Sequence, residues 1–139
     1  MKKNDQAVAL VTGASSGIGE ATALRLAKAG YKVFGTSRRG ASASRGSFEM
    51  LPLDVTSDAS VYAVVAEVIR REGRLDLLVN NAGFNVAAGG AEESSIQQAQ
   101  DIFDTNFFGM VRMSLAVVPH MRRQGSGRII NIGSVLGFM

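Results

Sequence analysis

A glycine-rich turn near the start of the chain constrains the fold more than any other feature. Residues 12–19 read Thr-Gly-Ala-Ser-Ser-Gly-Ile-Gly and lie between a short apolar run, residues 8–12, and a segment rich in Ala and Leu, residues 18–29. A strand that passes through glycines into a helix presents backbone N–H groups from the helix N-terminus, and such groups bind a pyrophosphate. The pattern therefore predicts a strand, a phosphate-binding turn and a helix, in that order.

The three glycines of this turn have different expected roles. We expect Gly13 to permit the tight turn, Gly17 the close approach of a phosphate, and Gly19 the packing of the helix on the strand. The spacing G-x3-G-x-G differs from the common G-x-G-x-x-G fingerprint, and no Gly-Lys-Ser or Gly-Lys-Thr of a P-loop follows. Glycines also serve plain turns, so the flanking strand and helix support the assignment. The candidate cofactor-binding residues here are Gly13, Ser15, Ser16, Gly17, Ile18 and Gly19.

Short apolar runs alternate with helical periodicity along the chain. Residues 18–29 should end as a helix at Gly30, and residues 57–72 form a second helix between Ser57, an expected N-cap, and Gly73, an expected stop. This alternation predicts an α/β fold with a parallel sheet. The expected strands are residues 8–12, 32–37, 48–53, 76–80 and 128–133.

A longer helix is expected over residues 98–123. Its section 107–118 is apolar on nearly every side, so one face should meet the sheet and another should meet something else. We expect the chain to form a homo-oligomer through this helix.

Composition excludes several classes of function. A chain of 139 residues fits one domain, residues 1–139, and with no cysteine and one histidine it offers no thiolate or histidine metal site. The net charge of +3 comes without a long basic stripe, so nucleic acid is not expected as a partner. Residues 1–6 are polar and the apolar run 7–11 is too short to cross a bilayer, so we expect no membrane partner and a cytoplasmic location.

Taken together, the motifs resemble the short-chain dehydrogenase/reductase family of the classical type. Residues 12–19 and the Asn-Asn-Ala-Gly of residues 80–83 fall at that family's positions, as do Asp54, Asn106 and Ser134. The resemblance implies a Rossmann-like, doubly wound parallel sheet with strand order 3-2-1-4-5, without the last helix and strands of the family fold. It also implies hydride transfer between a nicotinamide and a small-molecule carbonyl or secondary alcohol.

The end of the second expected strand favours the phosphorylated cofactor. In dinucleotide folds an acidic residue here binds the ribose hydroxyls of NAD, whereas this chain has Ser37, Arg38 and Arg39. A guanidinium offers several donors and a permanent charge to a 2′-phosphate. We therefore expect NADP(H) as cofactor, although the two arginines could also be a solvated loop pair.

Other cofactor contacts follow only from the resemblance. It implies that Asp54 meets the adenine, with Val55 beside it, and that Asn81, Ala82 and Gly83 line the adenosine side of the cleft. Asp54 could instead be a loop carboxylate before the next helix. We expect Asn80 to be structural and to tie neighbouring loops together.

The resemblance also assigns two residues to the chemistry. It implies that Ser134 orients the substrate and that Asn106 supports a proton relay, although Ser134 could be a turn serine and Asn106 could satisfy buried backbone groups. The family's Tyr-x3-Lys pair does not occur in the 139 residues, since Gly35 and Ala66 stand four residues after Tyr31 and Tyr62. We expect these 139 residues to bind the cofactor without catalysing turnover.

Two other interpretations remain open. One is a catalytically silent nucleotide-binding or subunit-contact module that ends at Met139; against it, the apolar edge of residues 129–132 would then lie unpaired. The other is a methyltransferase-like domain, which fits poorly because arginines replace the acidic ribose partner.

Overall fold

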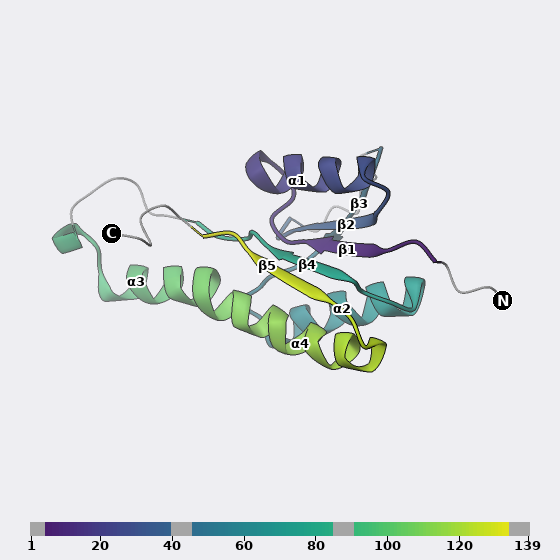
Figure 1. Ribbon diagram of the computed structural model, residues 1–139. Coiled ribbons are helices and arrows are strands. Elements are labelled where there is room, and N and C mark those ends of the chain that lie inside the picture. The colour runs from purple at the N-terminus through teal and green to yellow at the C-terminus, as the bar shows by residue number, and fades with distance from the viewer. Residues whose placement is uncertain (1–4, 40–45, 85–90, 134–139) are drawn as a thin grey trace.

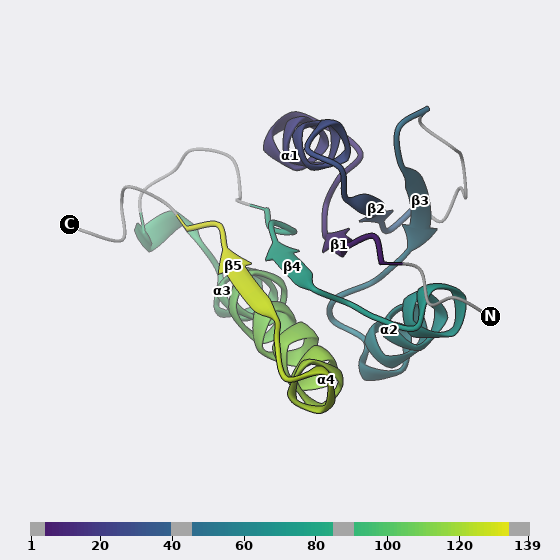
Figure 2. The same cartoon turned by 45° about the vertical axis from the view of Figure 1, so that its right-hand side comes forward.

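The structure is a computed structural model and describes residues 5–39, 46–84 and 91–133. Five parallel strands form one sheet in the order β3-β2-β1-β4-β5, which confirms the expected order (Figures 1 and 2). The strands end within two residues of their expected limits. They are β1 Val8–Val11, β2 Lys32–Ser37, β3 Glu49–Pro52, β4 Leu77–Asn80 and β5 Arg128–Asn131.

Helices cover both faces of this sheet, as a doubly wound fold requires. Figures 1 and 2 place α1, Gly17–Lys28, on one side and α2, Asp58–Glu72, on the other side together with α4, Gly109–Gln124. The turn η1, Ala91–Glu93, and the helix α3, Ile96–Phe103, lead into α4. Each crossover carries the chain past the carboxyl ends of the strands, where ligands of such sheets bind.

The core has one half on each face of the sheet. The half under α2 and α4 includes Val61, Val65, Val68, Met113 and Val117. The half under α1 includes Val11, Ala23 and Val33. Val61, Val64, Val65 and Val68 recur at helical spacing along α2 and are all buried, so one face of the helix packs on the sheet.

The expected single helix over residues 98–123 is longer and is interrupted. It begins at Ile96, ends at Gln124, and contains a π-helical turn, η2, at Asp104–Phe108. The turn brings Gly109 against Val55, since a Cβ at Gly109 would lie 2.7 Å from Val55 Cγ2. Periodicity alone could not predict the interruption, because the apolar pattern continues through it.

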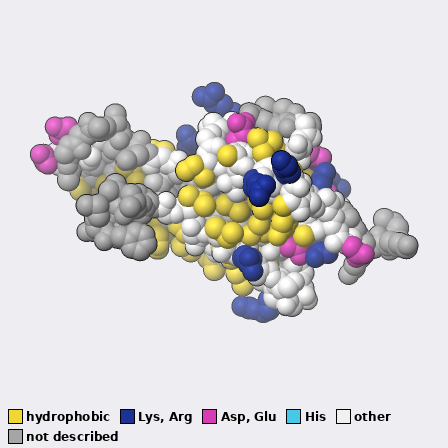
Figure 3. Space-filling model, turned by 45° about the horizontal axis from the view of Figure 1, so that its top comes forward, with side chains coloured by type: hydrophobic (Ala, Val, Ile, Leu, Met, Phe, Trp, Pro, Cys, Tyr) yellow, Lys and Arg dark blue, Asp and Glu magenta, His cyan; other side chains and the backbone are white. Residues whose placement is uncertain are grey.

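Hydrophobic side chains lie exposed on two surfaces. Along α3, η2 and α4 they are Ile96, Phe103, Phe107, Phe108, Val111 and Leu115. Figure 3 shows a second group, bordered by Lys and Arg side chains, on the side that carries α1, where Ile18 and Leu24 are exposed. Among the described residues, no helix combines the length and hydrophobicity needed to cross a membrane.

Serine side chains cap the N-termini of α2 and α3, whereas the serine at the N-cap of α1 makes no cap bond. Ser57 Oγ accepts a hydrogen bond from Ser60 N at 3.2 Å, and Ser95 forms a full capping box with Gln98 at the start of α3. Ser16 stands at the same position of α1 but makes no side-chain cap bond. The N-terminus of α1 therefore differs chemically from the N-termini of α2 and α3.

Replacing Ser57 by alanine is expected to lower the free energy of unfolding by about 1 kcal/mol, because the cap bond is lost. Ser16→Ala is the matched control, and its effect on stability should be at most a few tenths of that value. Urea denaturation followed by circular dichroism measures both. Equal losses for the two variants would contradict the difference in capping.

Candidate functional site

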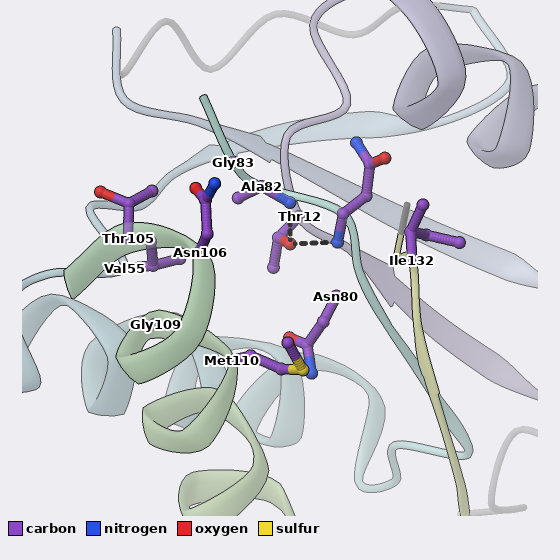
Figure 4. Close-up of a pocket in the computed structure, with 12 residues that line it drawn as sticks. Thr12, Val55, Asn80, Ala82, Gly83, Thr105, Asn106, Gly109, Met110 and Ile132 are labelled. Carbon is purple, nitrogen blue, oxygen red and sulfur yellow. Dashed lines mark hydrogen bonds between the residues drawn. The ribbon is translucent and has the colours of Figure 1, made fainter. Parts of the chain in front are cut away.

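Two adjoining cavities open at the carboxyl ends of the strands. The larger holds about 850 Å³ and is lined by the glycine-rich turn, the end of β2 and the segments that follow β3 and β4. The smaller holds about 320 Å³ and lies between the end of β4 and the start of α4 (Figure 4). Both cavities are lined by Val55, Ala82, Gly83 and Thr105.

The glycines of the turn are required by its geometry. Gly13 has a φ of 66° and Gly17 a φ of 58°, both in the left-handed region that favours glycine. A Cβ at Gly19 would overlap the carbonyl oxygen of Gly13, so Gly19 packs closely against the turn that follows β1. No atom lies within 4 Å of a Cβ added at Gly17, so the space beside it is open.

The start of α1 lies at the edge of the larger cavity, although Gly17, Ile18 and Gly19 line neither cavity. The hydrogen-bond ladder of α1 begins with Glu20 N donating to Ser16 O at 3.3 Å. The N–H groups of Gly17, Ile18 and Gly19 therefore have no acceptor within the helix. Ser15 and Ser16 line the cavity. An uncapped helix N-terminus carries a partial positive charge and favours an anion.

The end of β2 forms another wall of the same cavity. Ser37, Arg38 and Arg39 line it, and both arginines are exposed. Ala14 N donates to Thr36 O at 2.9 Å, which ties the glycine-rich turn to β2. The structure thus brings part of the glycine-rich turn, Gly13, Ser15 and Ser16, to the same cavity as the end of β2.

Asp54 turns its carboxylate back onto its own loop. Its Oδ1 accepts hydrogen bonds from Thr56 Oγ1 at 2.7 Å and from Thr56 N at 3.0 Å. These bonds lower the pKa of Asp54 against the opposing effect of burial, and the charges of Arg38 and Arg112 lower it further. The next residue, Val55, lines both cavities. This geometry of Asp54 matches the alternative in which its side chain is a loop carboxylate before the next helix.

The Thr12 hydroxyl organises the segment after β4. Its oxygen accepts hydrogen bonds from Asn81 N at 3.0 Å and from Ala82 N at 2.9 Å (Figure 4). No separate role of Thr12 was predicted from the sequence. Its position between a strand and a glycine was the signal that could have marked it. Asn81 Nδ2 donates to Gly13 O at 3.0 Å, so the two turns are joined at two points.

The two asparagines after β4 lie differently from one another. Asn80 is buried and its Nδ2 donates to Asn131 Oδ1 at 3.0 Å, which confirms a structural tie, here between β4 and β5. Asn81 lines the smaller cavity, whereas Ala82 and Gly83 line both. Asn81 is thus separated from the larger cavity, whereas the expected adenosine contacts of all three residues stay a prediction.

Asn106 lies in the π-helical turn and is paired with the backbone of Phe84. Its Oδ1 accepts from Phe84 N at 2.9 Å and its Nδ2 donates to Phe84 O at 2.8 Å. These bonds match the alternative in which Asn106 satisfies backbone groups. Ser134, the other residue expected to act in the chemistry, lies outside the described residues. Within the described part of the chain, no group of acidic, His or Cys side chains could hold a metal ion.

The sequence matches the profile of a known protein family over almost its whole length. The family profile described as "short chain dehydrogenase" matches residues 7–139. The chain belongs to the short-chain dehydrogenase family. Its members are oxidoreductases, and the doubly wound sheet with its glycine-rich turn is thus a short-chain dehydrogenase fold.

Relatives of known name agree with the profile. The chain is 45% identical over 133 residues to a 3-ketodihydrosphingosine reductase of Bacteroides thetaiotaomicron, covering 95% of this chain and 48% of that protein. It is 42% identical over 141 residues to the 3-oxoacyl-acyl-carrier-protein reductase FabG of Escherichia coli K12, covering 95% of this chain and 56% of that one. The chain spans about half the length of these relatives.

A solved structure shows the same arrangement of elements. The protein ElxO with NADP bound superposes with a TM-score of 0.87 at 30% identity, covering 96% of this chain and 58% of ElxO. The five-stranded sheet and its helices therefore correspond to one part of a longer short-chain dehydrogenase chain.

Proposed function

We propose that this chain binds NADP(H) in the larger cavity and serves an oxidoreductase that transfers hydride between the nicotinamide and a carbonyl or secondary alcohol. One observation carries the proposal. The larger cavity places the uncapped start of α1 at one side and Arg38 and Arg39 at another. A dinucleotide with a 2′-phosphate has anionic groups suited to both places.

The residues present fit this cofactor. The open space beside Gly17 and the backbone donors at the start of α1 would hold the pyrophosphate. Ser37 and the two arginines that follow would hold the 2′-phosphate, while Val55 and Ala82 would form apolar walls for the adenosine. The bound cofactor would supply the hydride. The name of ElxO with NADP bound supports this choice of cofactor.

The substrate is proposed from the names of the relatives. Both named reductases act on a compound with a keto group at carbon 3, which favours a ketone for the full-length protein here. We propose that Ser134 orients this ketone, whereas the relay role of Asn106 stays a prediction. Oxidation of NADPH with a 3-oxo ester tests the activity, and a full-length protein that binds NADPH without oxidising it would favour the silent module instead.

Replacing Arg38 by alanine is expected to raise the Kd for NADPH about 30-fold, because a charge-assisted hydrogen bond worth about 2 kcal/mol is lost. The Kd for NADH should change less than about twofold, since NADH lacks the 2′-phosphate. Fluorescence titration measures both constants. Arg25→Ala, on the exposed last turn of α1, is the control. Unchanged NADPH binding in Arg38→Ala would contradict the assignment of the phosphate site.

We further propose that the exposed apolar side chains of α3, η2 and α4 contact a second copy of the chain. Phe107, Val111 and Leu115 are exposed at intervals of four residues, which places them along one side of the helix. A contiguous row of exposed apolar side chains is unusual on the surface of a monomeric protein. Sedimentation velocity should give an oligomer at micromolar concentration, and a monomer there would contradict the contact.

A further inference from the structure

Arg112 on α4 joins three separate segments beside the two cavities. Its Nη1 donates to Val55 O and to Asp104 O, both at 3.1 Å, and its Nη2 donates to Asp104 Oδ1 at 2.6 Å. Its Nε donates to Asp58 Oδ1 at 3.0 Å. One side chain therefore links the loop after β3, the first residue of α2 and the start of the π-helical turn.

These segments carry the cavity walls, although Arg112 itself lines neither cavity. Val55 and Thr105 line both cavities, and Asn106 lines the smaller one. Val55 is held from two sides, because its carbonyl accepts from Arg112 and its side chain lies against Gly109. The position of Val55 relative to Thr105 therefore depends on the contacts of a residue that lies outside both cavities.

The chemistry of this contact requires an arginine. The guanidinium uses all three nitrogens in fixed directions, and its side chain is only 24% exposed. A lysine offers one ammonium on a flexible stem and cannot hold acceptors on three separate segments in the same geometry. The bond to Asp58 contributes least, because that carboxylate is 79% exposed to solvent.

We propose that Arg112 is a positioning residue for the adenosine end of NADP(H). It acts through Val55 and Thr105, whose separation it fixes, and the proposal rests on the function proposed above. Because these walls meet the adenosine and not the 2′-phosphate, Arg112 supports NADPH and NADH alike. This distinguishes it from Arg38, which supports NADPH alone.

The test compares two arginine variants in the full-length protein. Arg112→Met removes the link between the walls, whereas Arg74→Met removes a comparable two-bond pair with Asp76 beside β4, away from the cavities. We expect Arg112→Met to raise the Kd for NADPH and for NADH about tenfold, with their ratio unchanged, and Arg74→Met to leave both unchanged. Arg112→Lys should recover less than half of the loss. Loss of stability alone would not change the ligand affinity of the folded protein.

Each outcome supports or overturns the proposal. Equal NADPH affinity in wild type and Arg112→Met, or an equal loss in Arg74→Met, overturns it, as does a loss confined to NADPH. If Arg112→Met does not fold, Arg112→Lys is compared with wild type by the same criteria. Failure of the wild-type protein to bind NADPH would overturn the proposed function itself, so the two failures are distinguishable.

Discussion

Replacing Gly19 by alanine is expected to lower the free energy of unfolding by about 3 kcal/mol and to abolish NADPH binding. The added methyl would overlap the carbonyl oxygen of Gly13 and crowd Asn81 Nδ2, which donates to that same oxygen. The overlapped atom belongs to the backbone, so the turn and the start of α1 must move apart. Denaturant unfolding and NADPH titration measure the two losses.

The neighbouring Gly17 provides the control for this variant. Gly17→Ala should cost only about 1 kcal/mol, from the left-handed φ of 58°, because its Cβ meets no atom within 4 Å. If the two alanine variants are equally stable, the close packing of Gly19 on the turn is wrong.

Thr12→Val is expected to lower the free energy of unfolding by about 3 kcal/mol and to weaken NADPH binding at least tenfold. Valine has nearly the shape of threonine but no hydroxyl, so Asn81 N and Ala82 N would lose their shared acceptor. The Thr12 side chain is buried, which makes two unpaired donors costly. Ala82 lines both cavities, so the loss should reach the binding site.

Thr12→Ser separates the hydroxyl from the methyl group. Serine keeps the acceptor and should retain most of the NADPH affinity, with a stability loss of about 1 kcal/mol for the missing methyl. If Thr12→Ser and Thr12→Val weaken binding equally, the two hydrogen bonds do not hold the segment.

Local patterns predicted much of the fold. The strand limits followed from alternating apolar runs, and the ends of α2 followed from Ser57 and Gly73, because capping and left-handed glycine are properties of a few adjacent residues. The strand order came instead from the family resemblance. The glycine-rich turn likewise predicted a strand and a helix on either side. These features depend on contacts between near neighbours in the sequence, which a single sequence contains.

Long-range contacts could not be predicted in the same way. The pairs Thr12 with Asn81 and Arg112 with Val55 join residues 69 and 57 positions apart, and no local pattern marks them. The π-helical turn brings Gly109 against Val55, a contact that the sequence alone does not reveal. Asn106 was singled out by resemblance, whereas its pairing with Phe84 required the folded chain.

In the proposed function, NADPH binds at the uncapped start of α1 and at the end of β2. Titration of the 15N-labelled protein with NADPH, followed by amide chemical shifts, tests this most directly. We expect the largest shifts at Ser15 to Gly19 and at Ser37 to Arg39, with much smaller shifts in the second group when NADH is used. If the amide chemical shifts of both groups do not change at saturating NADPH, or if changes are confined to the far ends of the helices, this binding site is contradicted.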